Sequence, residues 1–207
     1  MSGTRRLPAD ARRREIVLAA LRVFSEGSYS GATTSEIARE AGITEPVLYR
    51  HFASKRDLWF ACLDAAWEEY RAVLDGVLAA QVAGGAPATP PPVARWKKAL
   101  MSNLWIQGIT EAGEDREIRR FVARHMRAVH DHIAGWIREQ QALGSVPPDR
   151  DADAEAWVMV GGALLRSVAH RLGGLLDDDD LASIQRERTR WLSGATDAPV
   201  AVAPTAR

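Results

Sequence analysis

The chain has 207 residues with equal numbers of basic and acidic side chains, 27 of each. Its single cysteine, Cys62, excludes an internal disulfide and is typical of a reducing compartment. No apolar run approaches the roughly 20 residues that a membrane-spanning helix needs, and no apolar signal segment stands at the N-terminus. Composition therefore predicts a soluble, cytoplasmic protein that does not bind membranes.

The charges are unevenly distributed along the chain. Residues 1–60 contain ten Lys and Arg residues against seven Asp and Glu, so the remainder is net negative. The positive charge is densest at the start, where five arginines face one aspartate: Arg5, Arg6, Arg12, Arg13 and Arg14. A locally basic end suits a nucleic-acid partner, although a solvated arm without a partner would have the same composition.

The apolar residues of the first 80 positions recur at intervals of three and four, which predicts helices and no strand. A first helix carries its apolar stripe over residues 16–24 and ends at Gly27. Two short helices follow within residues 33–52. Ser54 is then the expected N-cap of a long helix that extends to about Ala80.

The two short helices form the most informative segment of the chain. Thr33 and Glu36 have the spacing of a capping box, which opens the first of them. Gly42 stands where a left-handed residue ends that helix, and Thr44 is placed to cap the next. Proline is tolerated two residues later because it falls in the first helical turn.

The second short helix has an unusual outer face. Leu48 and Phe52 are four residues apart and turn inward. The outward side chains are then polar or aromatic: Val47, Tyr49, Arg50 and His51. Two short helices around a glycine turn, with such groups exposed, match the helix-turn-helix of DNA-binding proteins.

Beyond residue 80 the sequence predicts a proline-rich connection at 83–92 and then helices at 93–110, 115–143, 152–172 and 179–193. The predicted fold is all-α. A helix-turn-helix DNA-binding domain occupies residues 1–53, a helical ligand-binding and dimerisation domain residues 54–194, and a disordered tail residues 195–207.

Residues 11–63 resemble the DNA-binding head of the TetR family of transcriptional regulators. The resemblance rests on Ile-Ala-Arg-Glu-Ala-Gly-Ile-Thr at 37–44, Leu-Tyr-Arg-His-Phe at 48–52 and Ser-Lys-Arg-Asp-Leu at 54–58. It implies a homodimer that binds double-stranded DNA at an inverted-repeat operator, represses transcription and is released by a small-molecule effector.

The resemblance also implies roles for individual residues. Phosphate contacts fall to Thr34, Thr44, His51 and Lys55, and base contacts to Glu45, Pro46, Val47 and Tyr49. The complete DNA-binding set is Thr33, Thr34, Thr44, Glu45, Pro46, Val47, Tyr49, Arg50, His51 and Lys55. The role of Arg50 stays open, because the family varies at this position.

Physical chemistry supports several of these roles independently. The free N–H groups at helix starts near Thr34, Thr44 and Ser54 are natural phosphate sites. Val47 can pack on a thymine methyl group, and Glu45 can accept a hydrogen bond from cytosine N4. The alternative for Tyr49 and His51 is an ordinary place in the core or on the surface.

The helix at 152–172 is apolar almost all round, so it must be covered on more than one side. We expect it to form a homodimer interface with the last helix, through Trp157, Gly161, Leu164, Leu165, Ile184, Arg188 and Trp191. The alternative is the central helix of a monomer.

The aromatic residues of the body suggest a pocket for a hydrophobic effector. The candidate lining residues are Trp105, Gln107, His125, Met126, Val129 and Trp157. The alternative is that these side chains simply fill the core.

Catalytic and metal-site signatures are missing. His125, His130 and His132 do not share a helix face, and no glycine loop or nucleophile motif stands out. We expect no metal, no cofactor and no enzymatic activity. The competing hypotheses are a helical carrier or enzyme whose head has lost DNA binding, and a constitutive DNA-binding protein without an effector.

Overall fold

The computed structural model describes residues 8–82 and 92–193, with side chains described over residues 8–76 and 100–192. The described residues form eight helices and no strand, which confirms the all-α prediction. The predicted arm at Arg5 and Arg6, the connection before Pro92 and the tail at 195–207 lie outside the described residues.

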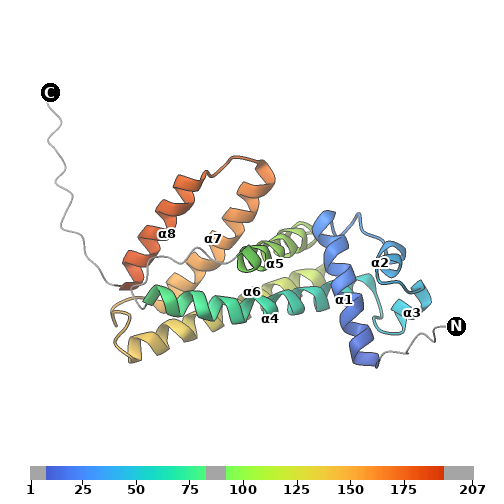
Figure 1. The fold of residues 1–207 in the computed structure, drawn as a ribbon, viewed down its shortest axis with the longest axis horizontal. Coiled ribbons are helices and arrows are strands. Elements are labelled where there is room, and N and C mark those ends of the chain that lie inside the picture. The colour runs from blue at the N-terminus through green and yellow to red at the C-terminus, as the bar shows by residue number, and fades with distance from the viewer. Residues whose placement is uncertain (1–7, 83–91, 194–207) are drawn as a thin grey trace.

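Three helices make a head at one end of the molecule: α1 (Ala9–Glu26), α2 (Thr34–Glu40) and α3 (Glu45–Tyr49). The long helix α4 (Lys55–Val82) leaves the head and runs beside α5 (Pro92–Glu111) and α6 (Arg116–Ala142). The last two helices, α7 (Ala152–Leu172) and α8 (Asp178–Ser193), form a hairpin at the opposite end (Figure 1). The predicted bounds of the last four helices differ from these by one residue at most.

One buried core continues from the head into the body. Ile16, Phe24, Ile37 and Leu48 fill the head, and Trp59 lies where α4 passes from the head to the body. Its ring meets Tyr29 of the α1–α2 loop edge-on at 5.6 Å. Aromatic pairs of this kind add stability beyond the area that they bury.

Gly108 of α5 lets three helices meet closely. A Cβ at this position would lie 2.4 Å from Cη2 of Trp59 and 2.6 Å from Cγ2 of Val122. These contacts are far shorter than van der Waals distance, so a larger residue would force α4 and α6 away from α5.

Polar contacts also tie the head to the body. The side-chain amide of Gln107 on α5 donates to the carbonyl of Phe24 on α1 at 2.8 Å, which satisfies a carbonyl at the C-terminal end of that helix. Arg56 at the start of α4 donates to Asp115, the N-cap of α6, at 3.0 Å and pairs with Glu117. The head is therefore held by specific bonds as well as by the core.

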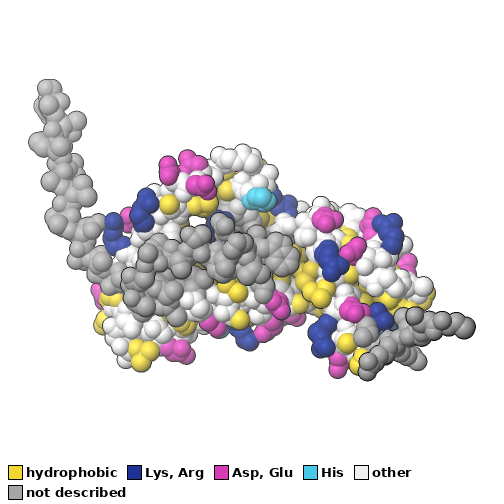
Figure 2. Space-filling view, viewed as in Figure 1, with side chains coloured by type: hydrophobic (Ala, Val, Ile, Leu, Met, Phe, Trp, Pro, Cys, Tyr) yellow, Lys and Arg dark blue, Asp and Glu magenta, His cyan; other side chains and the backbone are white. Residues whose placement is uncertain are grey.

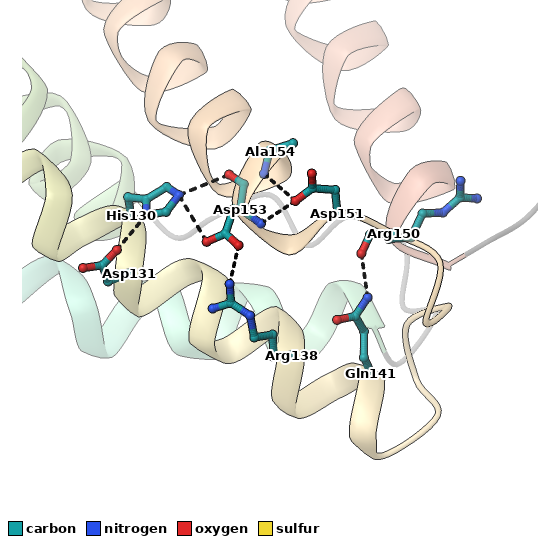
Figure 3. A network of polar contacts seen from close by, with 8 residues as sticks. All are labelled: His130, Asp131, Arg138, Gln141, Arg150, Asp151, Asp153 and Ala154. Atoms are coloured by element: carbon teal, nitrogen blue, oxygen red, sulfur yellow. Dashed lines mark hydrogen bonds and ion pairs between the residues drawn. The ribbon is translucent and has the colours of Figure 1, made fainter.

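A polar network fixes the joint between α6 and α7 (Figure 3). Asp151 caps α7 by accepting from the backbone N–H groups of residues 153 and 154, each at 3.0 Å. His130, which is 4% exposed, lies 2.8 Å from Asp131 and 3.2 Å from the carbonyl of Asp153. Gln141 donates to the carbonyl of Arg150 at 2.8 Å and so holds the loop that precedes α7.

The outer face of α8 is charged. Three aspartates occupy its first turn and an arginine its last, as the helix dipole favours. Figure 2 shows the acidic side chains gathered at the start of this helix and basic ones further along it.

Candidate nucleic-acid interface and helical body

The structure confirms the helix-turn-helix and both end signals of its first helix, whereas the side-chain cap predicted for Thr44 is wrong. Thr33 accepts from the N–H of Glu36 at 3.2 Å, while the Glu36 carboxylate accepts from the N–H of Thr33 at 2.9 Å. The bonds that this carboxylate accepts from the N–H and the hydroxyl of Thr33 lower the pKa of Glu36. Gly42 has a φ of 64°, and the flanking bond from the N–H of Ile43 to the carbonyl of Ala38 completes a Schellman turn.

The turn aims α3 outward. Leu48 is fully buried beneath the helix, whereas Tyr49 is 47% exposed. Pro46 and Arg50 are also exposed, and Val47 and His51 are partly buried. The inner and outer faces of α3 are thus divided as the sequence predicts.

Thr34 connects the starts of the two short helices. Its hydroxyl bonds to the Glu45 carboxylate and lies 3.2 Å from the hydroxyl of Tyr49. Thr44 stands at the N-cap position of α3, but its side chain makes no capping hydrogen bond. The sequence predicts phosphate contacts for both threonines; the structure gives Thr34 the additional role of orienting two outward side chains.

Basic residues stabilise the ends of the motif. Arg13 of α1 donates to the carbonyl of His51 at 2.7 Å and lies 4.0 Å above the ring of Phe52. Lys55 donates to the carbonyls of Tyr29 and Ala32 at 2.9 and 3.0 Å, so two of its three donors bind the α1–α2 loop. Its expected phosphate contact stays a prediction that depends on the third donor.

The comparisons with known proteins address the same segment. Residues 16–62 match the family described as bacterial regulatory proteins, tetR family. The head of this chain belongs to the TetR family. The match covers α1 from Ile16 onward, α2, α3 and the start of α4, and so includes the outward residues of the motif.

One relative is similar over a short segment of the chain and another over most of its length. The transcriptional activator FasR of Mycolicibacterium smegmatis is 48% identical over 58 residues, which are 28% of this chain and 26% of that protein. The chain thus matches about a quarter of the length of this relative. The regulator BetI of Rhizobium meliloti is 27% identical over 174 residues, which are 75% of this chain and 77% of that protein.

The fold of the whole chain also has solved counterparts. A transcriptional regulator of the family from Cytophaga hutchinsonii superposes with a TM-score of 0.67 at 15% identity, over 92% of this chain and 98% of that one. At this identity the likeness concerns the fold. No helix in the described part of this chain is long and apolar enough to cross a bilayer.

The candidate effector residues lie mostly in the core. Trp105 is fully buried, and its indole N–H donates to Nδ1 of His125 at 3.0 Å. Nε2 of the same histidine faces the carbonyl of Leu63 at 3.3 Å. Gln107 binds α1, and Val129 is 2% exposed. Their assignment to an effector pocket stays a prediction, but their packing favours the alternative of a filled core.

His125 should make stability depend on pH. Burial lowers the pKa of His125 to about 4, and its bond to Leu63 acts in the opposite direction. The unfolded state then binds more protons below pH 6.5, so the free energy of unfolding should fall by up to about 3 kcal/mol between pH 6.5 and 4. Urea unfolding at several pH values should show a smaller loss in His125→Gln than in the wild type.

The exposed His170 provides a control for this measurement. His170→Gln should keep the wild-type pH dependence, because this exposed side chain takes no part in the buried bonds of His125. Identical pH profiles for His125→Gln and the wild type would contradict the buried, neutral state of His125.

The outer face of α7 carries an apolar stripe that faces solvent. Its members recur at intervals of three and four residues: Val158, Gly161, Leu165, Val168 and Leu172. Gly161 and Leu165 belong to the predicted interface, whereas the other three were not predicted. The signal was present, because this spacing is that of a helix-pairing seam.

Other predicted interface residues turn toward their own subunit. Arg188 of α8 donates to the buried Glu155 of α7 at 2.9 Å. Ile184, Leu164 and Trp191 are partly buried. Trp157 is 39% exposed and stacks on His130 at 4.3 Å, at the edge of the stripe. The interface roles of these residues stay predictions, and the packing favours the stripe on α7 instead.

Proposed function

We propose that the protein regulates transcription by binding an inverted-repeat operator as a homodimer, and that a small-molecule effector bound in the body releases it. One observation carries the proposal: α3 presents the exposed Tyr49, with the partly buried Glu45 and Val47 beside it, from a helix-turn-helix whose first helix is capped. Such a helix can enter the major groove, where base edges differ from one another.

The residues at the helix starts are suited to contact phosphates, and the outward side chains of α3 are suited to contact bases. The free N–H groups at the starts of α2 and α3 are available to phosphates, and Thr44 adds a hydroxyl with no capping bond. Glu45 would accept from a cytosine amino group, with Thr34 holding its carboxylate in place. Phosphate contacts would set the register on the duplex, and the base contacts would set the sequence.

Dimerisation is the second part of the proposal. One head would make only a half-site contact, which is weak at physiological salt. The apolar stripe on α7 supports pairing with a second copy, since a helix face of this length is rarely left to solvent. The resulting pair would present two heads to the two halves of a palindrome.

Release by an effector needs a difference in affinity between two states of the body. The bond from Gln107 of α5 to Phe24 of α1 connects body and head, and the bond from Arg56 to Asp115 joins α6 to the start of α4, the helix that follows the head. A ligand that moved α5 or α6 would therefore shift α1 and α4. Repression then follows if the operator overlaps a promoter.

Operator binding by Tyr49→Ala tests the proposal. Fluorescence anisotropy would measure binding to DNA from the region beside the protein's own gene, at several salt concentrations. The variant should lose about 1–3 kcal/mol at the specific site, while binding to unrelated DNA changes little. Ile109→Ala, an exposed position on α5, is the matched control and should bind like the wild type. Wild-type protein that prefers no site in this region would contradict the proposed function.

A further inference from the structure

A cavity of about 400 Å³ opens beside α7 and α8. This volume is sufficient for a small organic ligand. The lining is charged with one aromatic wall, unlike the apolar pocket that the sequence predicts. The residues that line this cavity are Arg150, Glu155, Glu187, Arg188, Arg190 and Trp191.

The acids of this cavity already have partners. Glu187 pairs with Arg190 at 2.9 Å, and Glu155 accepts from Nε of Arg188 at 2.9 Å. Nη2 of Arg188 lies 2.8 Å from the same Glu155 oxygen but without hydrogen-bond geometry. Little acceptor capacity therefore remains on the protein side.

Two buried guanidinium N–H groups of the cavity residues make no hydrogen bond among the described residues. They are Nε of Arg150 and Nη2 of Arg188, and the second is in ion-pair contact with Glu155 at 2.8 Å. Buried guanidinium donors normally bind a carboxylate, a phosphate or water, because leaving them unpaired is costly. The two arginines come from different elements, the loop before α7 and helix α8, and both residues line one cavity.

A third guanidinium adds to the positive charge behind Arg188. Arg166 of α7 is partly buried, and its electrostatic neighbours are Tyr70 and Arg188. No carboxylate of the described residues pairs with it. Burial lowers the pKa of Arg166 and raises the pKa of Tyr70 to about 12. With Arg166, the region holds four arginines (Arg150, Arg166, Arg188 and Arg190) against two carboxylates, Glu155 and Glu187, so it retains a positive excess.

The geometry also supplies a flat apolar surface. The guanidinium of Arg150 lies 5.5 Å above the ring of Trp191, which is partly buried. Gln141 holds the backbone of this arginine, and Figure 3 shows the side chain pointing away from Gln141 toward α8. A planar anion can therefore meet a positioned cation and an indole face at the same place.

We propose that the cavity binds an aromatic carboxylate. Its carboxylate accepts hydrogen bonds from Arg150 and Arg188, and its ring packs against Trp191. This inference rests on the proposed function, because it identifies the bound aromatic carboxylate as the chemical class of the effector. The binding itself can be measured without DNA.

Isothermal titration calorimetry of the full chain with 2-naphthoate tests the proposal, and 2-naphthamide serves as the neutral probe of the same shape. The naphthoate should bind in a saturable manner, and the amide at least tenfold more weakly. Arg150→Gln and Arg188→Gln should each weaken naphthoate binding about tenfold or more, as expected for the loss of a charge-assisted hydrogen bond. Arg186→Gln, which removes an exposed arginine of the same helix outside the lining, is the matched control and should change binding less than threefold.

Arg188→Gln removes the partner of buried Glu155, so this variant can lose stability. Arg150→Gln avoids that difficulty, since its guanidinium has no carboxylate partner among the described residues. Equal binding of acid and amide, or no saturation with naphthoate, would overturn the proposal. A third result would also overturn it: the wild type does not bind naphthoate, and both arginine variants dissociate from dimer to monomer. The arginines would then pair with carboxylates of the second copy.

Anisotropy with operator DNA separates this site from the proposed function. If the protein binds naphthoate but no operator, the proposed carboxylate site stands and the proposed regulatory function is contradicted. Operator binding without naphthoate binding would retain the regulator and overturn the site.

Discussion

Leu165→Glu should convert the protein to a monomer and lower its operator affinity by roughly 100-fold or more, because two linked half-site contacts are then replaced by one. Leu165 is 42% exposed at the centre of the stripe on α7, with Val158 and Leu172 near its ends. In a dimer the introduced carboxylate would be buried without a partner in the described residues. Burying an unpaired charge costs several kcal/mol, which exceeds the contribution of a single apolar contact.

Analytical ultracentrifugation would measure the association, and anisotropy the operator affinity. Leu143→Glu is the matched control, since Leu143 is the same residue type, is 74% exposed and lies at the end of α6, outside the stripe. It should remain dimeric and bind DNA normally. A dimeric Leu165→Glu protein would place the interface elsewhere, and α8 would be the next face to test.

Gly108→Ala should destabilise the fold by roughly 1–3 kcal/mol, the usual cost of overpacking a well-packed core. The new methyl group would lie 2.4 Å from the Trp59 ring and 2.6 Å from Val122. Both neighbours are buried, so neither can turn aside cheaply. Because Trp59 also contacts Tyr29, the displacement should reach the α1–α2 loop and the head.

Chemical denaturation of both variants would measure this effect against Gly135→Ala on α6, where a Cβ would meet nothing within 4 Å. The control should gain up to about 1 kcal/mol, since alanine is the better helix former. If Gly108→Ala were as stable as the control, the close approach of α4, α5 and α6 would be wrong.

The helices and the head could be predicted because their signals are local. The capping box at Thr33 and Glu36 and the glycine at 42 determine where the backbone must turn, and the structure shows both. The inward direction of Leu48 follows from the helical period alone. Such signals need no knowledge of the rest of the chain.

Roles that depend on tertiary contacts could not be predicted in this way. Thr34 bonds to Glu45, eleven residues later, and Gln107 bonds to Phe24, eighty-three residues earlier. A hydroxyl or an amide fits many partners, so its sequence position does not reveal which one it meets. The assignment of Gln107 to a pocket illustrates this limit.

The body also shows why apolar composition is ambiguous. Trp105 and Leu165 both lie in strongly apolar helices, yet one is fully buried and the other is 42% exposed. The distinction depends on which helix face the neighbouring helices cover. The exposed residues of α7 recur every three or four positions, which is a sequence pattern distinct from that of the buried face.

The bond from Gln107 to the carbonyl of Phe24 has a consequence for engineering chimeric regulators. If the first 50 residues were transplanted onto the body of a relative, the Phe24 carbonyl would lose its hydrogen-bond donor. The residue of that relative at the position of Gln107 would pack against an α1 surface to which it does not fit. Operator preference should therefore be exchanged most successfully between relatives by transplanting only α2 and α3 and retaining α1 of the host protein.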